Sequence, residues 1–464
     1  ALNEFLERHE KEKIETRDLS TYEGNAYLGI DAGSTTIKVV LISEEKEILF
    51  SHYSHNKGNP LDNIIATLKN LYSKMSEKVI IKGSCVTGYG ESLIKAALRV
   101  DIGIVETMAH YKGSQFFQPN VDFILDIGGQ DMKCLKIQDG IITSILLNEA
   151  CSSGCGSFLE TFAHSLGMDI LEFSRLGMES KSPADLGTRC TVFMNSKVKQ
   201  AQKDGVEVSD ISAGLSYSVV KNTLFKVIKI KNKDELGKNI VVQGGTFLNN
   251  SVLRAFELVS ERNVIRPNVA GLMGAFGAAL IAMEQAEESS TIMTLDELNN
   301  FNCTTNLTRC KLCNNHCLLT IHKFKNGETF ISGNRCDNPL GKMKKNTAPN
   351  MFDYKYNRLF NYTPLEPSKA TRGEIGVPRV LNFYDSYPFW FTLLTHLGFR
   401  VIISDDSSKK LYEKGIDTIS SDSICYPAKL VHGHIVDLIE KGVKRIFYPC
   451  VIFEEKEDIK SSNQ

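Results

Sequence analysis

Cysteines, aspartates and glycines in a few short stretches carry most of the chemistry that this sequence offers. In NEACSSGCGSFLE, Cys151 and Cys155 stand four residues apart, a spacing found in metal half-sites, in redox pairs and in thiols that merely pack. Cys151 follows an expected strand and precedes a helix expected to begin near Gly156, so its thiolate would lie at a helix N-terminus, which stabilises negative charge. Cys190 also precedes an expected helix. We interpret Cys155 as a packed thiol.

A second group of cysteines has metal-site spacing. Residues 310–336 contain the pattern C-x₂-C-x₃-C-x₁₈-C, with an expected strand pair between its third and fourth members. Four thiols in this arrangement predict a metal site, which zinc or an iron–sulfur cluster would satisfy. Cys425 and Cys450 stand at expected strand–helix junctions, where they are either packed thiols or ligands of a further cluster. The four candidate ligands of the metal site at 310–336 are Cys310, Cys313, Cys317 and Cys336.

Three glycine turns, each placed after an expected strand, indicate a polyphosphate site. GIDAGSTTIK puts Asp31 at a strand end before a turn, and LDIGGQDMK repeats the arrangement with Asp126, Gln130 and Asp131. Glycines let the backbone approach phosphate groups, and two facing carboxylates can hold a hydrated Mg²⁺. VVQGG supplies the third turn. The candidate nucleotide-binding residues are Gly33, Ser34, Thr35, Lys38, Gly128, Gly129, Gly244, Gly245 and Gly274.

The elements that must position these turns predict an α/β fold. Residues 27–55 and 123–147 both read as strand, Asp, Gly turn and strand, a coarse internal duplication with copies about 95 residues apart. Apolar positions recur at helical spacing over 156–229, and the Gly/Ala-rich stretch NVAGLMGAFGAALIAMEQ predicts a further helix. The Asp-Gly pair at 139–140 predicts a hairpin turn. VPRVLNFY (377–384) is the first strand of a later alternation of expected strands and helices.

Taken in order, these motifs resemble those of the actin/sugar kinase/Hsp70 superfamily. GIDAGSTTIKVVLI is similar to its first phosphate motif, LDIGGQD to its second and VVQGGTFLN to its adenosine motif. The sequence has no G-x-x-x-x-G-K-[ST], which disfavours a P-loop ATPase. Together with TGYG, NEACSSGCGSF and TRCTVF, the motifs resemble BadF/BadG/BcrA/BcrD-type ATPases, the activators of 2-hydroxyacyl-CoA dehydratases and relatives of benzoyl-CoA reductase subunits. This resemblance covers residues 25–285, and residues 300–464 resemble the additional domain of long, multidomain CoA-substrate-specific enzyme activases.

The resemblance implies an oxygen-sensitive [4Fe-4S] protein in which ATP hydrolysis drives low-potential single-electron transfer to a dehydratase- or reductase-type acceptor, with ferredoxin or flavodoxin as donor. It assigns the cluster to Cys151 and Cys190. A homodimer, or a pseudo-dimer with a second ATPase copy, would complete the four thiolates. Asp31 and Asp126 would organise Mg²⁺, and Gln130 or Asp131 would orient the attacking water. The smaller activators carry no cysteine at the position of Cys155.

These observations predict a fold and a domain order. Duplicated ribonuclease-H-like lobes form an α/β ATPase domain at 25–285, with the cluster segment at about 148–200. The remaining predicted segments are an N-terminal linker (1–24), a second linker (286–302), a Cys-rich metal module (303–341), a connector (342–375) and a partial α/β domain (376–464).

Composition narrows the class of protein further. The formal net charge of −1 gives no bulk field that would attract nucleic acid or an anionic membrane. No apolar run is long enough to predict a membrane span, and the charged N-terminus does not resemble a signal peptide. Twelve cysteines without secretory signals indicate a reducing, cytoplasmic compartment. The missing initiator Met and the C-terminal EEKEDIKSSNQ predict that the chain is a fragment of a longer polypeptide.

Two other functions fit parts of the pattern. A small-molecule kinase of the same superfamily would use the same phosphate turns, but the sequence offers no convincing catalytic base, and Cys151 and Cys190 would have no role. A nucleotide-switched scaffold would use the Cys-rich module as a structural zinc site. At this level the acyl-CoA system served and the choice between zinc and iron at 310–336 stay open.

Overall fold

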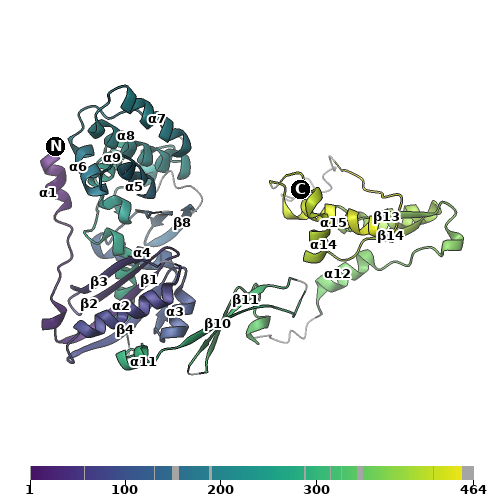
Figure 1. Ribbon diagram of the computed structural model, residues 1–464, viewed down its shortest axis with the longest axis horizontal. Coiled ribbons are helices and arrows are strands. Elements are labelled where there is room, and N and C mark those ends of the chain that lie inside the picture. The colour runs from purple at the N-terminus through teal and green to yellow at the C-terminus, as the bar shows by residue number, and fades with distance from the viewer. Residues whose placement is uncertain are drawn as a thin grey trace. The chain divides into compact units, whose positions relative to one another are not determined.

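The computed structural model describes most of the 464-residue chain and divides it into two compact units, residues 1–302 and 303–464 (Figure 1). None of the helices in the described part of the chain is long and apolar enough to cross a membrane. The described residues are 2–56, 58–129, 131–148, 156–187, 191–286, 289–313, 315–325, 327–341, 349–421 and 423–451.

The first lobe of the first unit is built on a five-stranded sheet with the strand order β3-β2-β1-β4-β5. β1 pairs antiparallel with β2 and parallel with β4. From Ala26 to Ala32 every residue of β1 is buried or nearly so, because helices and neighbouring strands cover both faces of this central strand. The strands are β1 (Gly24–Ala32), β2 (Thr36–Ser43), β3 (Ile48–His55), β4 (Val79–Thr87) and β5 (Ile102–Gly103).

The second lobe repeats this arrangement in a four-stranded sheet with the order β8-β7-β6-β9. β6 pairs antiparallel with β7 and parallel with β9, as β1 does with β2 and β4. The predicted duplication of an α/β lobe is therefore confirmed. Asp139 and Gly140 join β7 to β8 with φ values of 52° and 76°, the left-handed pair that a two-residue hairpin turn requires. The strands are β6 (Phe123–Ile127), β7 (Met132–Gln138), β8 (Ile141–Asn148) and β9 (Ile240–Gln243).

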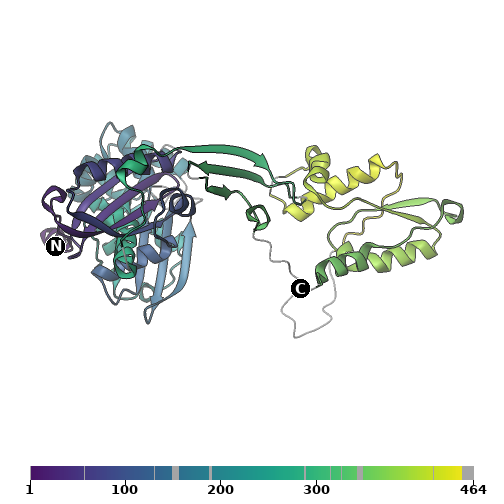
Figure 2. The same ribbon diagram turned by 90° about the horizontal axis from the view of Figure 1, so that it is seen from below.

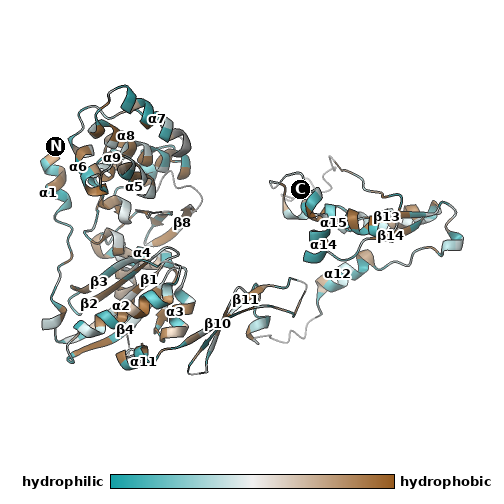
Figure 3. Ribbon diagram, viewed as in Figure 1, coloured by the Kyte–Doolittle hydropathy of each residue, from teal (hydrophilic) through white to brown (hydrophobic). Residues whose placement is uncertain are grey.

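The helices of the first unit cover these two sheets. The core of the second lobe lies between β6 and α5, α6, α8 and α9, where Phe123, Phe173 and Phe256 are fully buried. The edge strand β8 instead leaves Ile141, Ile145 and Leu147 exposed (Figure 3). The helices are α1 (Leu2–His9), α2 (Pro60–Lys74), α3 (Glu91–Leu98), α4 (Glu106–Phe117), α5 (Gly156–Ser165), α6 (Ile170–Glu179), α7 (Thr191–Lys203), α8 (Val208–Lys221), α9 (Asn250–Ser260), α10 (Met273–Gln285) and α11 (Leu295–Asn299).

Two helices connect the lobes and contact each other. α4 leads from β5 of the first lobe to β6 of the second, and α10 returns from the second lobe to pack on β1, β2 and β4. Their backbones approach so closely that a Cβ atom at Gly277 would lie 1.8 Å from the carbonyl oxygen of Ala109. A Cβ atom at Gly29 of β1 would lie 1.9 Å from the carbonyl oxygen of Ala275. Glycine at these positions is therefore a packing requirement.

An N-terminal arm, which we define as residues 2–23, contacts both lobes (Figure 1). In α1, Phe5 is buried in the core of the second lobe, and Arg8 forms a bidentate pair with Glu257 of α9 at 2.6 Å for each bond. Further along, Thr16 forms a parallel bridge with Ile48 of β3 in the first lobe. The predicted linker is thus a structured element that joins the two lobes on the outside.

We expect Glu257→Gln to loosen this arm. Burial would raise the pKa of Glu257, but the Arg8, His9 and Val264 N–H donors lower it from 4.5 to about 2. A depressed carboxyl pKa stabilises the fold above the unfolded-state value, and this stabilisation is lost as the pH falls through about 2. The variant should therefore be less stable by about 3 kcal/mol at neutral pH, with the difference shrinking below pH 4.5 and vanishing near pH 2.

Hydrogen exchange of residues 2–17 and circular dichroism across this pH range measure the effect. Fluorescence would not, because the single tryptophan, Trp390, belongs to the second unit. The matched control is Glu261→Gln, which removes an exposed pair with Lys233 and should leave stability close to that of wild type, because solvent screens surface ion pairs. A difference in the free energy of unfolding between wild type and Glu257→Gln that stays constant with pH would contradict the lowered pKa of Glu257.

The second unit begins with an antiparallel three-stranded sheet, β10-β11-β12 (Figure 2). β11 and β12 form the strand pair expected between Cys317 and Cys336. In the α/β part that follows, β13 and β14 are parallel and α13 lies between them in the chain. The elements are β10 (Cys303–Arg309), β11 (Leu318–Phe324), β12 (Thr329–Ser332), α12 (Met351–Phe360), β13 (Glu374–Val377), α13 (Phe383–His396), β14 (Arg400–Ile403), α14 (Lys409–Gly415) and α15 (Tyr426–Glu440).

The strand expected over 377–384 is wrong in position. β13 ends at Val377, because Pro378 has no N–H group to continue a strand ladder. The chain then turns into α13: the N–H of Val380 bonds to the carbonyl of Pro378, and the N–H of Phe383 bonds to that of Val380, each at 3.0 Å.

Candidate functional site

The first predicted phosphate turn places a buried ion pair at the end of β1. Asp31 is fully buried, and Lys38, its register partner on β2, bonds to its Oδ2 at 2.9 Å. Burial would lower the pKa of Lys38, but the Asp31 carboxylate and the more distant Asp126 raise it above its ordinary value, so the amine stays charged. Oδ1 of Asp31 is buried without a protein partner. That oxygen is free to bind a cation or a cation-bound water.

Asn56 holds the turn that follows β1. Its side-chain amide donates to the carbonyl of Gly33 at 2.9 Å and to that of Ser34 at 2.7 Å, while its own N–H donates to the carbonyl of Thr35 at 2.9 Å. Three successive carbonyls are thereby satisfied from one side. Asn56 is buried and lies 21 residues beyond Thr35 in the chain, so local spacing did not identify it.

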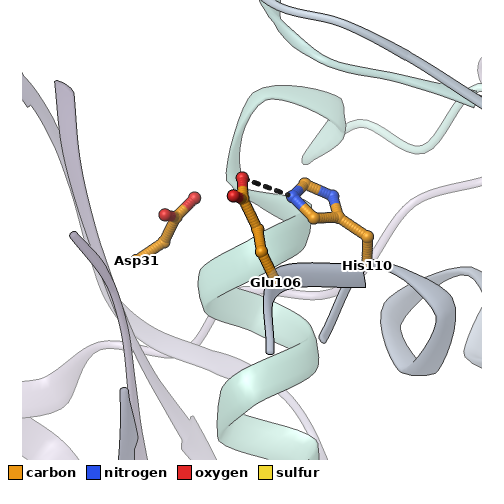
Figure 4. Close-up of side chains that lie close together, drawn as sticks. All are labelled: Asp31, Glu106 and His110. Atoms are coloured by element: carbon orange, nitrogen blue, oxygen red, sulfur yellow. Dashed lines mark hydrogen bonds and ion pairs between the residues drawn. The ribbon is translucent and has the colours of Figure 1, made fainter. Parts of the chain in front are cut away.

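The second predicted phosphate turn ends β6 and connects to a network of charged side chains. Asp126 is buried, and its Oδ2 lies 3.1 Å from Nδ1 of His110 in α4. Nε2 of His110 lies 3.4 Å from Oε1 of Glu106 (Figure 4). Lys133 of β7 bonds to Glu106 and to Asp131, each at 2.7 Å. The network joins α4, β6 and β7 around the turn.

The charges in this network support one another. Burial would lower the pKa of His110, but Asp126 and Glu106 raise it to about 9. Burial would raise the pKa of Asp126, but His110, Lys133 and Lys38 hold it below its ordinary range. Burial would also lower the pKa of Lys133, but its acidic neighbours, led by Asp126 and Glu106, raise it above its ordinary value. At neutral pH the carboxylates are therefore ionised and their partners are cationic.

Candidate ligand atoms of Asp31, Glu106 and His110 lie within 4.8 Å of one another (Figure 4). Lys38 and Lys133 already neutralise the two carboxylates, and His110 faces Asp126. Mg²⁺ prefers oxygen ligands and keeps several waters. The site therefore fits a hydrated Mg²⁺ near the free Asp31 oxygen, and the histidine belongs to the supporting network.

The glycines of the second and third turns lie against each other and against α5. A Cβ atom at Gly244, whose φ is 90°, would lie 2.3 Å from the carbonyl oxygen of Ile127. The carbonyl of Gly128 accepts hydrogen bonds from Thr246 Oγ1 and from the N–H of Gly156, each at 3.0 Å. The carbonyl of Gly129 accepts one from the N–H of Ser157, also at 3.0 Å. The start of α5 is thus bonded directly to the predicted phosphate turn.

A cavity of about 450 Å³ lies between the lobes beside these turns. It is lined by Ser51 and Tyr53 of β3 on one side and by Gly129, Thr246 and Leu272 on the other. Its size lies within the range of small-molecule and cofactor sites. A Cβ atom at Gly274 would lie 2.7 Å from Oδ2 of Asp31, so glycine is also required where α10 passes the first turn.

The structure brings together most of the predicted nucleotide-site residues. Asp31, Asp126 and Asp131 each lie in an ion pair, with Lys38, His110 and Lys133 respectively. The second and third glycine turns are joined by the hydrogen bond from Thr246 to Gly128. Gln130, Cys151, Cys155 and Cys190 lie outside the described residues.

The four predicted ligand cysteines of the Cys-rich module, Cys310, Cys313, Cys317 and Cys336, do not lie together in the described structure. Cys310 is buried and its N–H bonds to the carbonyl of Cys317 at 2.8 Å, whereas Cys313 and Cys336 are exposed. Among the described residues, their sulfur atoms do not form a group of three within 4.8 Å of one another. A metal at this module stays a prediction. Cys425, exposed, caps the N-terminus of α15, and Cys450 is also exposed.

Sequence reasoning missed several residues of the site. Glu106 and His110 stand four residues apart in α4, so they share a helix face, and this E-x-x-x-H spacing is a signal that could have identified them. Lys133 follows Asp131 by two residues in a strand and so points to the same face. Gln243, which precedes the VVQGG glycines and contacts His110, carried no signal of its own.

Two ribonuclease-H-like lobes, with a glycine turn and an aspartate at corresponding strand ends, define the actin/sugar kinase/Hsp70-like class of ATPase fold. Within that class, the chain belongs to the BadF/BadG/BcrA/BcrD ATPase family, whose model matches residues 28–282. Residues 374–464 match a second model, the CoA enzyme activase uncharacterised domain (DUF2229).

The chain is similar to characterised activators over this first domain. The 2-hydroxyisocaproyl-CoA dehydratase activator of Clostridioides difficile is 33% identical over 264 residues, which cover 56% of this chain and 96% of that protein. The (R)-2-hydroxyglutaryl-CoA dehydratase activating ATPase of Acidaminococcus fermentans is 31% identical, covering 56% and 97%. The crystal structure of the A. fermentans (R)-2-hydroxyglutaryl-CoA dehydratase component A aligns with a TM-score of 0.50 at 30% identity, covering 57% of this chain and 99% of that one.

Proposed function

We propose that this protein is an ATP-hydrolysing iron–sulfur activator that drives low-potential single-electron transfer to an enzyme of the 2-hydroxyacyl-CoA dehydratase or benzoyl-CoA reductase type. The observation that carries the proposal is the pair of hydrogen bonds from Gly156 and Ser157, at the start of α5, to the carbonyls of Gly128 and Gly129. They join the nucleotide turn to the helix that begins directly after the Cys151 segment. The family and the relatives named as dehydratase activators support the partner class.

In the nucleotide site, this chain's residues bind and orient ATP. The glycine turns leave room for the phosphates. Asp31 and Asp126 would hold a hydrated Mg²⁺, which would supply positive charge to neutralise the phosphates. Lys38 holds Asp31 in place and His110 holds Asp126, while Lys133 pairs with Asp131. Asp131 or Gln130 orients the attacking water. Thr246 and Leu272 line the cavity that receives the nucleoside.

The coupling to electron transfer follows from the helices that start beside the nucleotide site. α5 begins at Gly156 and α7 begins at Thr191, each soon after a predicted cluster cysteine. A change in the Gly128–Gly129 turn between nucleotide states shifts the start of α5 through its two hydrogen bonds. The surroundings of Cys151 change with it, and solvent exposure and hydrogen bonding are among the factors that set the reduction potential of a cluster.

The number of cluster ligands and the exposed apolar side chains of β8 both indicate that the protein acts with partners. Cys151 and Cys190 supply two of the four thiolates that a [4Fe-4S] cluster takes, so a second copy, or a homologous ATPase copy in a longer chain, supplies the others. β8 ends three residues before Cys151 in the chain and leaves Ile145 and Leu147 exposed, and exposed apolar side chains of this kind favour contact with a partner protein. A ferredoxin or flavodoxin would supply the electron.

Anaerobic purification tests the cluster. We expect brown protein with an absorption band at about 400 nm. Iron and sulfide should be present in equal amounts per dimer, as a [4Fe-4S] centre requires. Cys151→Ala and Cys190→Ala should each lose the band and most of the iron. Cys155→Ala, a thiol removed from the same segment, should keep both.

A colourless wild-type protein, or loss of the band in Cys155→Ala but not in Cys151→Ala, would overturn this ligand assignment. Zinc and iron analysis of Cys310→Ser separates the second predicted site. We propose that this module binds zinc or a further iron–sulfur cluster, so the variant should lose one metal without losing the band that depends on Cys151.

A further inference from the structure

His110 occupies the centre of the charged network, where each ring nitrogen faces a different group. Nδ1 lies 3.1 Å from Oδ2 of Asp126 and 2.6 Å from the side-chain amide of Gln243. Nε2 lies 3.4 Å from Oε1 of Glu106. Only 6% of the residue is exposed, so these contacts decide its orientation. Because Nδ1 faces a carboxylate, it carries a proton and donates to Asp126.

The amide of Gln243 completes this arrangement. In the structure, Nε2 of Gln243 lies 2.6 Å from Nδ1 of His110, and Oε1 of Gln243 accepts from the Ser114 hydroxyl at 3.0 Å. A proton on Nδ1 requires the amide to turn over, so that its oxygen faces the imidazole and its nitrogen faces the Ser114 hydroxyl. The Ser114 hydroxyl then donates its one proton to the carbonyl of His110 at 2.9 Å. The single proton on Nδ1 lies between Asp126 and Gln243, and the ring cannot rotate without moving away from both.

We propose that His110 is a positioning residue for ATP hydrolysis. Its Nδ1–H donates to the Asp126 carboxylate and so holds that carboxylate in the orientation needed for a hydrated Mg²⁺. The inference rests on the proposed function, in which Asp126 would hold that ion. His110 stands on α4, the helix that connects the two lobes, and a Cβ atom at Gly274 of α10 would lie 3.1 Å from its Nε2. The imidazole therefore connects α4 to an aspartate of the second lobe, and it lies against α10.

Two substitutions separate this role from simple packing. In His110→Asn, the side-chain amide reaches the position of Nδ1 and keeps a donor for Asp126, but it does not reach Glu106. In His110→Gln, the longer amide reaches the position of Nε2 and keeps the Glu106 contact, but Asp126 loses its donor. Both variants are neutral and both remove the ring, so they differ only in which contact they keep: the one to Asp126 in His110→Asn, or the one to Glu106 in His110→Gln.

We expect His110→Gln to hydrolyse ATP about 10- to 100-fold more slowly than wild type and to need more Mg²⁺ for half-maximal activity, while the KM for ATP stays within about threefold. His110→Asn should keep a kcat at least about tenfold above that of His110→Gln. Their thermal unfolding should be similar. Equal kcat values, or a higher kcat for His110→Gln, would overturn the inference.

Further controls keep the test decisive. Gln243→Leu removes the second partner of Nδ1 and should also lower kcat. It therefore tests the same role if His110→Gln does not fold. An unchanged kcat in Gln243→Leu would contradict the proposal. Wild-type protein that hydrolyses no ATP would instead refute the proposed function. The two failures are therefore distinguishable in one set of assays.

Discussion

Asp31→Asn should lower the rate of ATP hydrolysis by about 10³-fold, the largest effect on activity that we expect from one substitution. The change removes a carboxylate that organises Mg²⁺ in the proposed site. It also leaves the buried Lys38 ammonium, now 2.9 Å from a neutral group, without an anion. Removing one partner of a buried ion pair costs about 3–5 kcal/mol, so the variant should also unfold more easily. Steady-state phosphate release and thermal unfolding measure the two effects.

A double variant separates these two effects. Asp31→Asn with Lys38→Met removes both charges and replaces the lysine stem by an apolar side chain of similar length. Replacing a whole buried pair is often neutral for stability. We therefore expect the unfolding midpoint to return close to that of wild type while ATP hydrolysis stays as low as in Asp31→Asn. Recovery of hydrolysis along with stability would mean that Asp31 acts only through folding.

Gly277→Ala should lower stability, because it separates the two helices that connect the lobes. The added Cβ atom would lie 1.8 Å from the carbonyl oxygen of Ala109, where an ordinary contact needs more than 3 Å. Alanine gains about 1 kcal/mol of helix propensity over glycine, but overpacking in a rigid interior costs about 1–3 kcal/mol and more when the obstacle is backbone. The steric cost should therefore exceed the gain in helix propensity by at least about 2 kcal/mol.

The same substitution should also disturb the site, since Ala109 is the neighbour of His110 in α4. Movement of α4 away from α10 carries the imidazole away from Asp126. We expect lower thermal stability together with a lower kcat. Gly271→Ala, where the nearest atom to the added Cβ is at 3.7 Å, is the control for stability and should unfold close to wild type. Unchanged stability of Gly277→Ala would show that the helices separate at little cost.

The sequence by itself determined the fold class, the three glycine turns and their aspartates. Each of these is a local signal. A strand, an aspartate and a glycine turn are written in consecutive residues, and their repetition at Asp31 and Asp126 revealed the duplicated lobes. The Asp-Gly hairpin at 139–140 was predictable for the same reason, since its left-handed backbone needs those residue types. The strand expected at 377–384 failed because the apolar pattern outweighed Pro378.

Only the tertiary structure decided what surrounds the turns. His110, Lys133 and Gln243 come from a helix and two strands that are far apart in the chain, and their partnership exists only once both lobes have folded. Asn56 and the N-terminal arm escaped prediction for the same reason. Their function lies in hydrogen bonds and burial across long sequence distances, whereas residue spacing reports only which neighbours share a face. The aspartates could be found from their turns, but the groups that hold them in place could not.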